Sequence, residues 1–435
     1  MTTVYPIPDN HAQRFALHNE VHARSSLILG LPLRATHLAL SRTGDEKLYE
    51  RHHLAQLCER FGNTPPAADA DHFSATFDTF QLRWEQHGEF STYTFYVQGT
   101  EEKPFASPAL KKVPIDWLSA MTGKVLVATH ATILPVTDST NTTTDLSAVS
   151  PYFASHPIIG STVTGGAANV FTDFRIHVDG FSRFLIVDHN LRVEQGARLL
   201  HRLFEIEVYR VLALLAFPIA RQLSPELKKA DQQLYTITNA MTQSGGDDTK
   251  LLEELTALAA EIENHISSNH LRFAAAEAYY TLVERRLVDL REVRIQGIQT
   301  IGEFINRRLE PAVNTCRFTS NRFKSLSERV GNASQLLRTR VDIMIERQNQ
   351  RLLTSMNLRA KMQLRMQQMV EGISIVAITY YAASLIRAMT QTLQSLGVHV
   401  EPEVIEGASI PFILIAIGLG LRRIHHIIKT TTDAS

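Results

Sequence analysis

Hydrophobic and polar residues alternate along much of the first 190 positions, and this period of two is typical of half-buried β-strands. Glycine in the turns His87-Gly88 and Asp179-Gly180 supplies the positive φ angles of a tight hairpin, so each turn should join neighbouring strands. A mixed, mostly antiparallel sheet is therefore expected. The predicted strands are rich in β-branched and aromatic residues, and they cover Leu33–Ser41, Phe73–Gln86, Phe90–Val97, Lys124–Leu134 and Ala168–Val178.

The pattern becomes helical after Asn190 and stays helical to the C-terminal region. Breaks are expected at Pro225, at Gly245-Gly246 and before Pro311, because proline and glycine disfavour helix interiors. The polar stretch Thr137–Val149 is expected to be an exposed loop. The predicted helices, including one that interrupts the strands, cover Asp45–Phe61, Leu191–Leu223, Glu226–Met241 and Asp247–Leu309.

A final helix is predicted to begin near Ser320 and to continue to Ile386, which makes it roughly 100 Å long at the standard rise. This helix carries a ladder of apolar residues close to heptad spacing: Phe323, Leu326, Val330, Ala333, Leu337, Val341, Met344, Leu352 and Met356. Gln348 interrupts the ladder at one inward position. Such a ladder needs partner helices, either from the same chain in a packed hairpin or from other subunits in a coiled coil.

Two apolar segments near the C-terminus, Gly372–Ile386 and Ala408–Leu421, predict a transmembrane hairpin with spans of about 370–387 and 407–424. Each segment is shorter than the usual span of about 20 residues, so a buried hairpin of a soluble protein is the alternative. Arg387 and Arg422 stand where long side chains extend a span by reaching the interface. The connector Gln391–Glu406 contains glutamates but no Lys or Arg, whereas both outer flanks are basic. The positive-inside rule then predicts an inner-membrane protein with both termini cytoplasmic.

The fold class expected from these patterns is α+β. Residues 1–190 should form a cytoplasmic sheet domain, 191–369 a long helical, coiled-coil-like region, and 370–428 the membrane hairpin. Such a protein has most of its mass outside the bilayer, and its partners are expected to be the lipid bilayer and other copies of the same chain.

Charge adds one local feature to this picture. Lys plus Arg and Asp plus Glu are equal at 44 each, so no global field favours nucleic acid. The segment Arg317–Arg365, however, contains eleven Lys/Arg and only three acidic residues. Proximity to anionic lipid explains this excess of positive charge. The two cysteines, Cys58 and Cys316, are too few for a disulfide framework. No cleavable signal peptide is expected at the N-terminus.

Candidate chemistry is sparse. His18 and His22 in the run HNEVH would share one helix face, as a zinc site requires, but the position of Glu20 does not match the zinc-protease spacing. We therefore expect a ligand contact or a structural hydrogen bond there and no metal. Thr164-Gly165 begins a simple turn, because it lacks the lysine and the glycine spacing of a phosphate loop.

Two further groups are candidates for function. Strand alternation would place Asp173, Arg175 and His177 on one sheet face, as a polar surface or as a small-ligand or anion pocket. Cys58 has apolar neighbours on its helix and is expected in the core, so no nucleophile, cofactor or enzymatic activity is predicted. Hydroxyl-bearing residues of the first span either bond their own helix backbone or line a pore: Ser374, Thr379, Tyr380 and Ser384.

The chain contains six long and specific sequence blocks: LHNEVHAR, RHHLAQLCERFG, WEQHGEFSTYTF, VFTDFRIHVDGFSRFL, LLRTRVDIMIERQNQ and VEGISIVAITYY. These blocks resemble a bacterial family, domain-of-unknown-function family 3422, whose members are described as predicted membrane-anchored proteins. Ser25 stands where that pattern has a proline. The resemblance spans nearly the whole chain and implies membrane anchoring, without an established reaction or ligand.

The layout is also similar, more distantly, to two-span CorA-type divalent cation channels. In those channels a Gly-Met-Asn triplet closes the first span, whereas here the residues after the span read IRAMTQTLQSLGV. The sequence therefore favours a membrane-anchored protein whose cytoplasmic module binds a ligand or a partner. A CorA-like oligomeric channel without the entrance triplet is the alternative.

Overall fold

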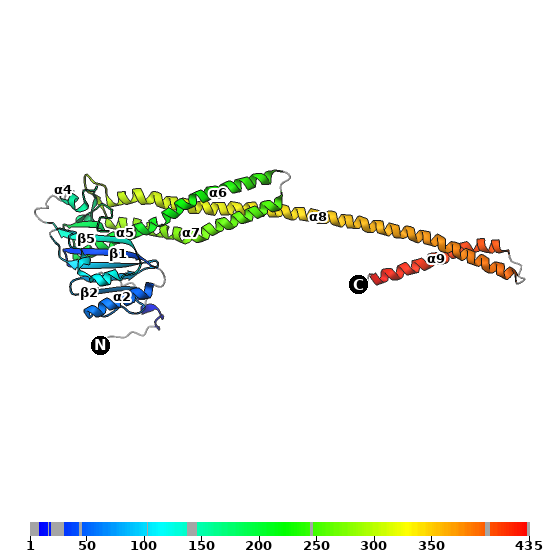
Figure 1. Ribbon diagram of the computed structural model, residues 1–435, viewed down its shortest axis with the longest axis horizontal. Helices are drawn as coiled ribbons and strands as arrows, with labels where there is room; N and C mark the ends of the chain where they lie inside the picture. Colours follow the sequence, from blue (N-terminus) through cyan, green and yellow to red (C-terminus); the bar gives the residue numbers. More distant parts are fainter. Residues whose placement is uncertain are drawn as a thin grey trace. The chain divides into compact units, whose positions relative to one another are not determined.

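The computed structural model describes residues 8–15, 17–18, 30–42, 46–101, 103–136, 146–243, 247–395 and 401–432 (Figure 1). The chain divides into two compact units, Met1–Ser334 and Gln335–Ser435, and each is described by itself. The first unit contains the sheet and most of the helices that pack on it. The second contains the remainder of one very long helix and the C-terminal helix.

The first unit is built on a nine-stranded sheet with the order β2-β3-β4-β1-β5-β8-β7-β6-β9. Neighbouring strands pair antiparallel, except that β5 and β8 run parallel. A mixed, mostly antiparallel sheet is thus confirmed. The strands are β1 (Leu33–Ser41), β2 (His72–Thr76), β3 (Gln81–Gln86), β4 (Phe90–Gln98), β5 (Lys124–Pro135), β6 (Ile159–Val163), β7 (Ala168–Thr172), β8 (Ser182–Asp188) and β9 (Val293–Arg294).

Helices surround this sheet and dominate the rest of the chain, so the α+β class is also confirmed. The α-helices are α2 (Glu46–Phe61), α3 (Ile115–Ser119), α4 (Leu146–Val149), α5 (Val193–Leu214), α6 (Ala216–Thr242), α7 (Asp248–Leu290), α8 (Ile301–Ser395) and α9 (Pro402–Thr432). Short 3₁₀ turns are η1 (Ala109–Lys112), η3 (Ser150–Phe153) and η4 (Thr164–Gly166), and η4 is the turn expected between two strands.

Side-chain alternation along the central strand β1 divides the core into two layers. Leu33 packs in one layer with Leu199 of α5, and the same layer continues to α7 and to the start of α8. Leu38, five residues later, packs in the opposite layer with Leu54 of α2. Because successive strand residues point to opposite faces, one buried strand supports helices on both sides of the sheet.

Helices α6 and α7 and the first part of α8 lie side by side (Figure 1). Ala220, Ala276 and Cys316, one from each helix, share a small apolar cluster. The ladder residues Phe323 and Val330 are 3% and 0% exposed, so this part of the ladder is buried by packing within one chain.

Two helix boundaries differ from the sequence prediction, because two prolines that were expected to end helices lie inside them. The predicted break at Pro225 is wrong, since that residue lies inside α6; the helices separate instead at Leu215, three residues before Pro218. Pro218 has no N–H to donate to the carbonyl of Leu214, and its ring crowds that carbonyl. Pro311 likewise lies inside α8. The preceding helix already ends at Leu290, because Arg291 adopts a left-handed conformation with φ 49°.

Two strand predictions and one loop prediction also need correction. Phe73–Gln86 is two strands, since a turn closed by a hydrogen bond from Phe77 N–H to the Phe80 carbonyl separates β2 from β3. Strand β7 ends at Thr172 and not at Val178, because Phe174 has a positive φ of 52° that is incompatible with an extended strand. Within the polar stretch 137–149, the last four residues form α4, and the others lie outside the described residues.

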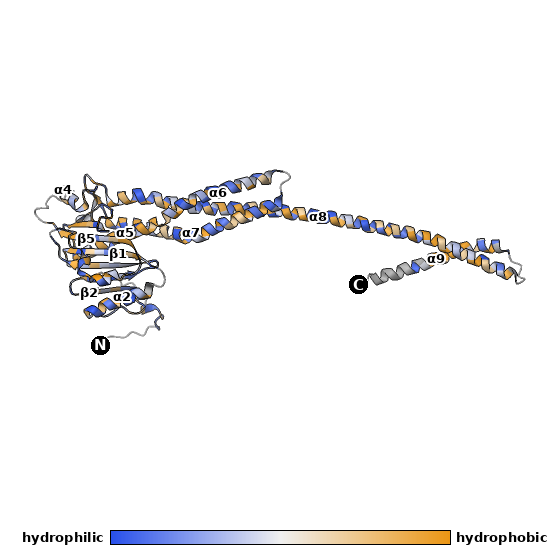
Figure 2. Cartoon of the chain, in the orientation of Figure 1, coloured by the Kyte–Doolittle hydropathy of each residue, from blue (hydrophilic) through white to orange (hydrophobic). Residues whose placement is uncertain are grey.

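The second unit contains two helical stretches that are long and apolar enough to cross a membrane: the C-terminal portion of α8, and Glu403–Gly420 of α9. Figure 2 shows hydrophobic residues concentrated on these stretches. Large apolar side chains on them face outward, with Ile373 71% and Phe412 75% exposed. The later ladder residues Leu352 and Met356 are also exposed, in contrast to the earlier ones.

Candidate functional site

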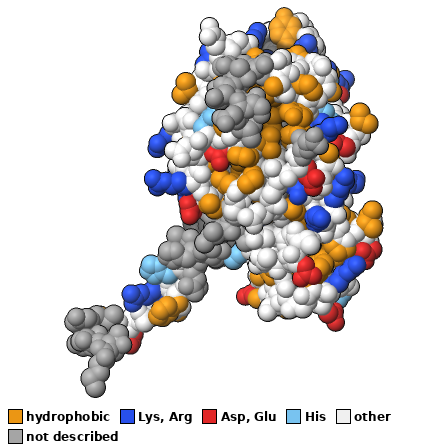
Figure 3. All heavy atoms as spheres, turned by 90° about the vertical axis from the view of Figure 1, so that its left-hand side faces the viewer, with side chains coloured by type: hydrophobic (Ala, Val, Ile, Leu, Met, Phe, Trp, Pro, Cys, Tyr) orange, Lys and Arg blue, Asp and Glu red, His pale blue; other side chains and the backbone are white. Residues whose placement is uncertain are grey.

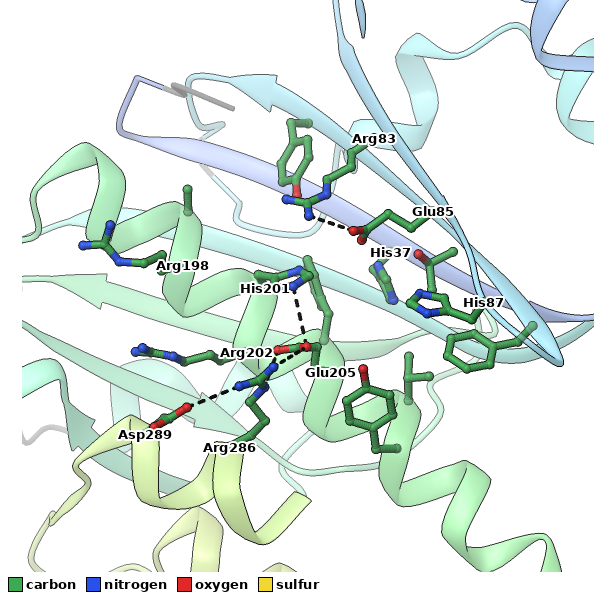
Figure 4. Close-up of a pocket in the computed structure, with 17 residues that line it drawn as sticks. His37, Arg83, Glu85, His87, Arg198, His201, Arg202, Glu205, Arg286 and Asp289 are labelled. Carbon is green, nitrogen blue, oxygen red and sulfur yellow. Dashed lines mark hydrogen bonds and ion pairs between the residues drawn. The ribbon is translucent and has the colours of Figure 1, made fainter. Parts of the chain in front are cut away.

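A cavity of about 320 Å³ lies in the first unit between the sheet and helices α5 and α7 (Figure 4). Its wall combines residues as far apart in the sequence as His37 and Asp289. The chemically active side chains around it are His37, Arg83, Glu85, His87, Arg198, His201, Arg202, Glu205, Arg286 and Asp289.

Local periodicity explains how these residues reach the cavity. On β3, Arg83 and Glu85 alternate with the buried Leu82 and Trp84, so the charged pair faces the helices while the apolar pair enters the opposite core layer. On α5, cavity residues recur at intervals of four, from Ala197 to Tyr209, which is the spacing of one helix face.

Two ion pairs organise the polar part of the cavity. Arg83 Nη2 lies 2.8 Å from Glu85 Oε1 on the sheet side, and both side chains are largely buried. Desolvation, the largest single cause, raises the pKa of Glu85, but the charge and hydrogen bond of Arg83, together with His201 and His87, outweigh it, so this pKa lies below its ordinary value. On the helix side, Arg286 contacts Glu205 through two nitrogens at 2.7 and 2.9 Å. Two guanidinium groups are thus held at fixed positions around one cavity.

His37 contributes an available hydrogen-bonding atom. Its ring is stacked on Phe204 with centroids 4.6 Å apart, and its Nδ1 lies 2.8 Å from the Thr94 hydroxyl. Its buried Nε2 has no hydrogen-bond partner among the described residues. Burial, assisted by the nearby His201, lowers the pKa of His37 to about 3, so the ring is neutral at physiological pH.

The charges around the cavity favour an anion. Four arginines and three carboxylates line it, which gives a formal excess of one positive charge with the histidines neutral. Arg198 and Arg202, on the first half of α5, form no ion pair with any residue that the structure describes, whereas the other two arginines are paired. Arginine also matches the planar geometry of carboxylate and phosphate groups.

The structure brings two of the predicted strand residues together, but not by strand alternation. Asp173 and His177 lie in the segment after β7, where His177 Nε2 is 3.1 Å from Asp173 Oδ2. A residue that the sequence analysis did not single out, His156, lies on the other side of this carboxylate, with Nδ1 2.8 Å from Oδ2. The side chain of Arg175 is exposed, and only its backbone N–H reaches Asp173.

The remaining predicted residues have separate environments. His18 is exposed, while Glu20 and His22 lie outside the described residues. In the second unit, the hydroxyls of Ser374 and Thr379 donate to backbone carbonyls four residues earlier. Thr379, Tyr380 and Ser384 line a shallow groove between α8 and α9.

The cavity residues escaped the sequence analysis because none belongs to a compact motif. The available hints were an Arg-x-Glu alternation on β3 and an Arg-x-x-x-Arg spacing, Arg198 to Arg202, on α5. Neither hint is specific, since exposed helices and strand edges carry such pairs routinely. On the face shown in Figure 3, Lys/Arg and Asp/Glu side chains are interspersed around a central group of hydrophobic ones, and no field of one sign stands out.

Comparison with known proteins gives one match. A family model described as "Protein of unknown function (DUF3422)" matches residues 9–428, which is nearly the entire chain. No curated protein and no solved structure matches. The architectural resemblance to CorA-type channels therefore has no support.

Proposed function

The chain belongs to the family of proteins of unknown function DUF3422, and from this premise we propose that it is a membrane-anchored protein that binds a small anionic molecule. The binding site is the cavity between the sheet and helices α5 and α7. The observation that carries the proposal is the placement of two fixed guanidinium groups, Arg83 and Arg286, around a cavity that His37 also lines. A volume of about 320 Å³ suits a molecule of metabolite size.

Binding follows from exchange of partners at the arginines. A carboxylate or phosphate of the ligand would compete with Glu205 for Arg286, and Arg202 would supply the charge that the existing pairs lack. His37 would hydrogen-bond the neutral part of the ligand through Nε2, as donor or acceptor according to its tautomer. The proposed role is binding; neither thiol of the chain, Cys58 or Cys316, lines this cavity.

The apolar stretches of the second unit support the membrane part of the proposal. Their large side chains are exposed in one chain, and lipid is the environment in which such exposure costs least. The acidic connector and the basic flanks support an orientation in the inner membrane with both termini in the cytoplasm. A cysteine-labelling map tests this: Ser395→Cys should react with a membrane-impermeant maleimide added to intact cells, and Ser327→Cys only after lysis. The reverse pattern would reject the orientation.

The exposed second half of the ladder supports a homo-oligomer. Leu352 and Met356 are 62% and 65% exposed, and copies of the same helix would cover them in register. The mass of the detergent-solubilised protein, corrected for bound detergent, tests this point. A multiple of 48.8 kDa is expected, and a monomer at all concentrations would rule out the oligomer.

Ligand binding is tested by thermal unfolding of the full chain in detergent. Both tryptophans, Trp84 and Trp117, are buried in the first unit, so their fluorescence reports on the unit that holds the cavity. The probes are inorganic phosphate, succinate and adenosine monophosphate, with choline and glucose as cationic and neutral comparisons. An anion at 100 times its Kd should stabilise the unit by about 2.7 kcal/mol.

Substitutions of cavity residues test whether the anion acts at this cavity. Arg202→Gln and Arg286→Gln should each reduce the anion-dependent shift, whereas Arg285→Gln should leave it unchanged. Arg285 is the matched control, because it lies one residue before Arg286 on α7 but is exposed and does not line the cavity. The proposal fails if the neutral and cationic probes shift the melting temperature as much as the anions, or if neither cavity variant alters the shift.

A further inference from the structure

Three side chains from two separate segments converge on one point in the first unit, and none of them lines the anion cavity. They are His156, which follows η3, and Asp173 and His177, which follow β7. Their potential ligand atoms all lie within 4.8 Å of one another. The Asp173 side chain is 0% exposed and that of His177 4%, whereas that of His156 is 33% exposed. The cluster is therefore open to solvent at the His156 side only.

The distances fit a metal-binding arrangement. His156 Nδ1 and His177 Nε2 lie 2.8 and 3.1 Å from the same oxygen, Asp173 Oδ2. Atoms bound to one zinc ion at about 2.0–2.1 Å are roughly 3 Å apart when the coordination is tetrahedral or octahedral. Small rotations of the two imidazoles would thus place all three atoms around one ion.

The backbone around the cluster is held in an unusual conformation. Ala154 and Ser155, immediately before His156, have φ of 53° and 59°, and Phe174, immediately after Asp173, has φ of 52°. These are three of the five described non-glycine residues with positive φ. Such conformations cost free energy and concentrate at functional sites, where the surrounding structure holds them. Here they turn both segments so that their polar side chains meet.

A backbone hydrogen bond orients the carboxylate. The N–H of Arg175 donates to Asp173 Oδ1 at 3.1 Å. His177 Nε2 lies 3.3 Å from the same oxygen and 3.1 Å from Oδ2, and His156 Nδ1 lies 2.8 Å from Oδ2. Oriented ligand carboxylates of this kind are usual in metal sites. In the absence of a metal, the ring nitrogens that face Asp173 donate N–H hydrogen bonds to its carboxylate when they carry the proton. A metal bound at those nitrogens requires each neutral ring to carry its proton on the other nitrogen.

We propose that His156, Asp173 and His177 bind one divalent transition-metal ion of the zinc class. Two imidazole nitrogens and one carboxylate oxygen suit zinc, ferrous iron or manganese better than calcium or magnesium, which prefer oxygen ligands. Three protein ligands leave at least one coordination position for water on the exposed side of His156. This site was not expected from the sequence, because its third ligand, His156, precedes Asp173 by 17 residues, with strands β6 and β7 and the turn η4 between them.

The test is metal binding by the full chain in detergent. After chelation and removal of the chelator, Zn²⁺ is titrated calorimetrically and Co²⁺ by visible absorption. One equivalent should bind, and the Co²⁺ complex should show ligand-field bands of a low-coordinate site. His156→Gln and His177→Gln should each weaken binding at least about 100-fold, since loss of a residue that only orients a metal ligand already costs about 10- to 100-fold.

A matched control separates this site from incidental binding by other histidines. His72 Nδ1 lies 3.0 Å from Asp71 Oδ1, so it forms a surface His–Asp pair without a second histidine. His72→Gln should retain the full stoichiometry and affinity. The proposal is overturned if the wild-type chain binds no Zn²⁺ or Co²⁺, or if its binding persists in both cluster variants. Because the wild-type titration decides the first point, it does not depend on whether a variant folds.

Discussion

The guanidinium of Arg286 contacts both carboxylate oxygens of Glu205, at 2.7 and 2.9 Å, and thereby joins α7 to α5 beside the cavity. The Glu205 side chain is only 13% exposed, so it depends on this partner for much of its solvation. Arg286→Met should therefore lower the free energy of unfolding by about 2–3 kcal/mol, somewhat less than for a fully buried pair. Urea unfolding followed by tryptophan fluorescence measures this change.

The double variant Glu205→Met/Arg286→Met provides the control for this prediction. Because it removes both charges of the pair, Glu205 no longer leaves a largely buried carboxylate, and only the more exposed Asp289, which Arg286 also contacts at 3.4 Å, loses a partner. The cost of the double variant should therefore be smaller than the sum of the two single changes. Strict additivity of the two single effects would show that the ion pair is not coupled.

A second prediction concerns acid sensitivity. His37 on β1 and His130 on β5 are buried on opposite faces of the sheet. His37 stacks on Phe204, and His130 stacks on Phe181. Burial lowers the pKa of His37 to about 3 and that of His130 to about 4, although the nearby Asp179 opposes the shift for His130. The unfolded chain, with a histidine pKa of about 6.5, then binds more protons than the folded chain below that pH.

The stability that these neutral histidines contribute is present above about pH 6.5 and is lost as the pH falls toward the folded-state pKa. Between pH 7 and pH 5 each should cost about 2 kcal/mol of unfolding free energy. His37→Gln and His130→Gln should each flatten the dependence on pH by that amount. The exposed His270 is the control, since His270→Gln should leave the slope unchanged. Equal slopes in all variants would contradict the argument.

How far the sequence predicts this fold depends on whether a feature is local. The strand Leu33–Ser41 is found as predicted and the helix near Asp45–Phe61 within one residue, because their patterns are decided by nearby residues. Strands β6 and β9 were missed. The two-residue strand β9 forms only because Val293 and Arg294 pair with β6, about 130 residues earlier, and no local pattern specifies that pairing.

The candidate sites also depend on contacts between residues that are distant in the sequence, more strongly than the strands and helices do. Asp173 and His177 stood out because they are close in the sequence, although their meeting depends on the turn at Phe174 and not on a strand. The cavity requires β3, α5 and α7 to pack together, so the proximity of Arg83, His201 and Arg286 is a tertiary property. Sequence spacing carries no information on such contacts until the fold is known.

Thiol reactivity gives a third prediction. Both cysteines are buried, and burial raises the pKa of Cys316 to about 11, compared with 9.0 for a free thiol. At pH 8 the thiolate fraction of Cys316, and with it the rate of alkylation by iodoacetamide, should be reduced about 100-fold or more. Cys58 should also be protected, and both thiols should react in denaturant. An exposed control, Ser268→Cys on α7, should react at once in the folded protein. Rapid modification of native Cys316 would show that this helix packing opens readily.

The last prediction concerns the start of α8, where Glu292 provides hydrogen-bond acceptors for the first backbone N–H groups of the helix. Its carboxylate accepts from the backbone N–H of Gly302 at 3.1 Å and from the hydroxyl of Ser161 at 2.8 Å, while Ser161 accepts from Ile301 N–H. Glu292→Ala should thus cost about 2 kcal/mol, from a lost helix cap and a buried hydroxyl without its partner.

Two further variants distinguish this cap from a general charge effect. A Cβ in Gly302→Ala would meet the Glu292 carboxylate well inside van der Waals contact, so this variant should displace the carboxylate and destabilise the unit by a similar amount. Glu310→Gln, an exposed change on the same helix, should cost less than about 0.5 kcal/mol. Equilibrium unfolding in urea measures all three. If Glu292→Ala and Glu310→Gln had equal effects, the carboxylate of Glu292 would not be acting as a cap, and the start of α8 would have to be stabilised by apolar packing of Ile301 and Ile305 alone.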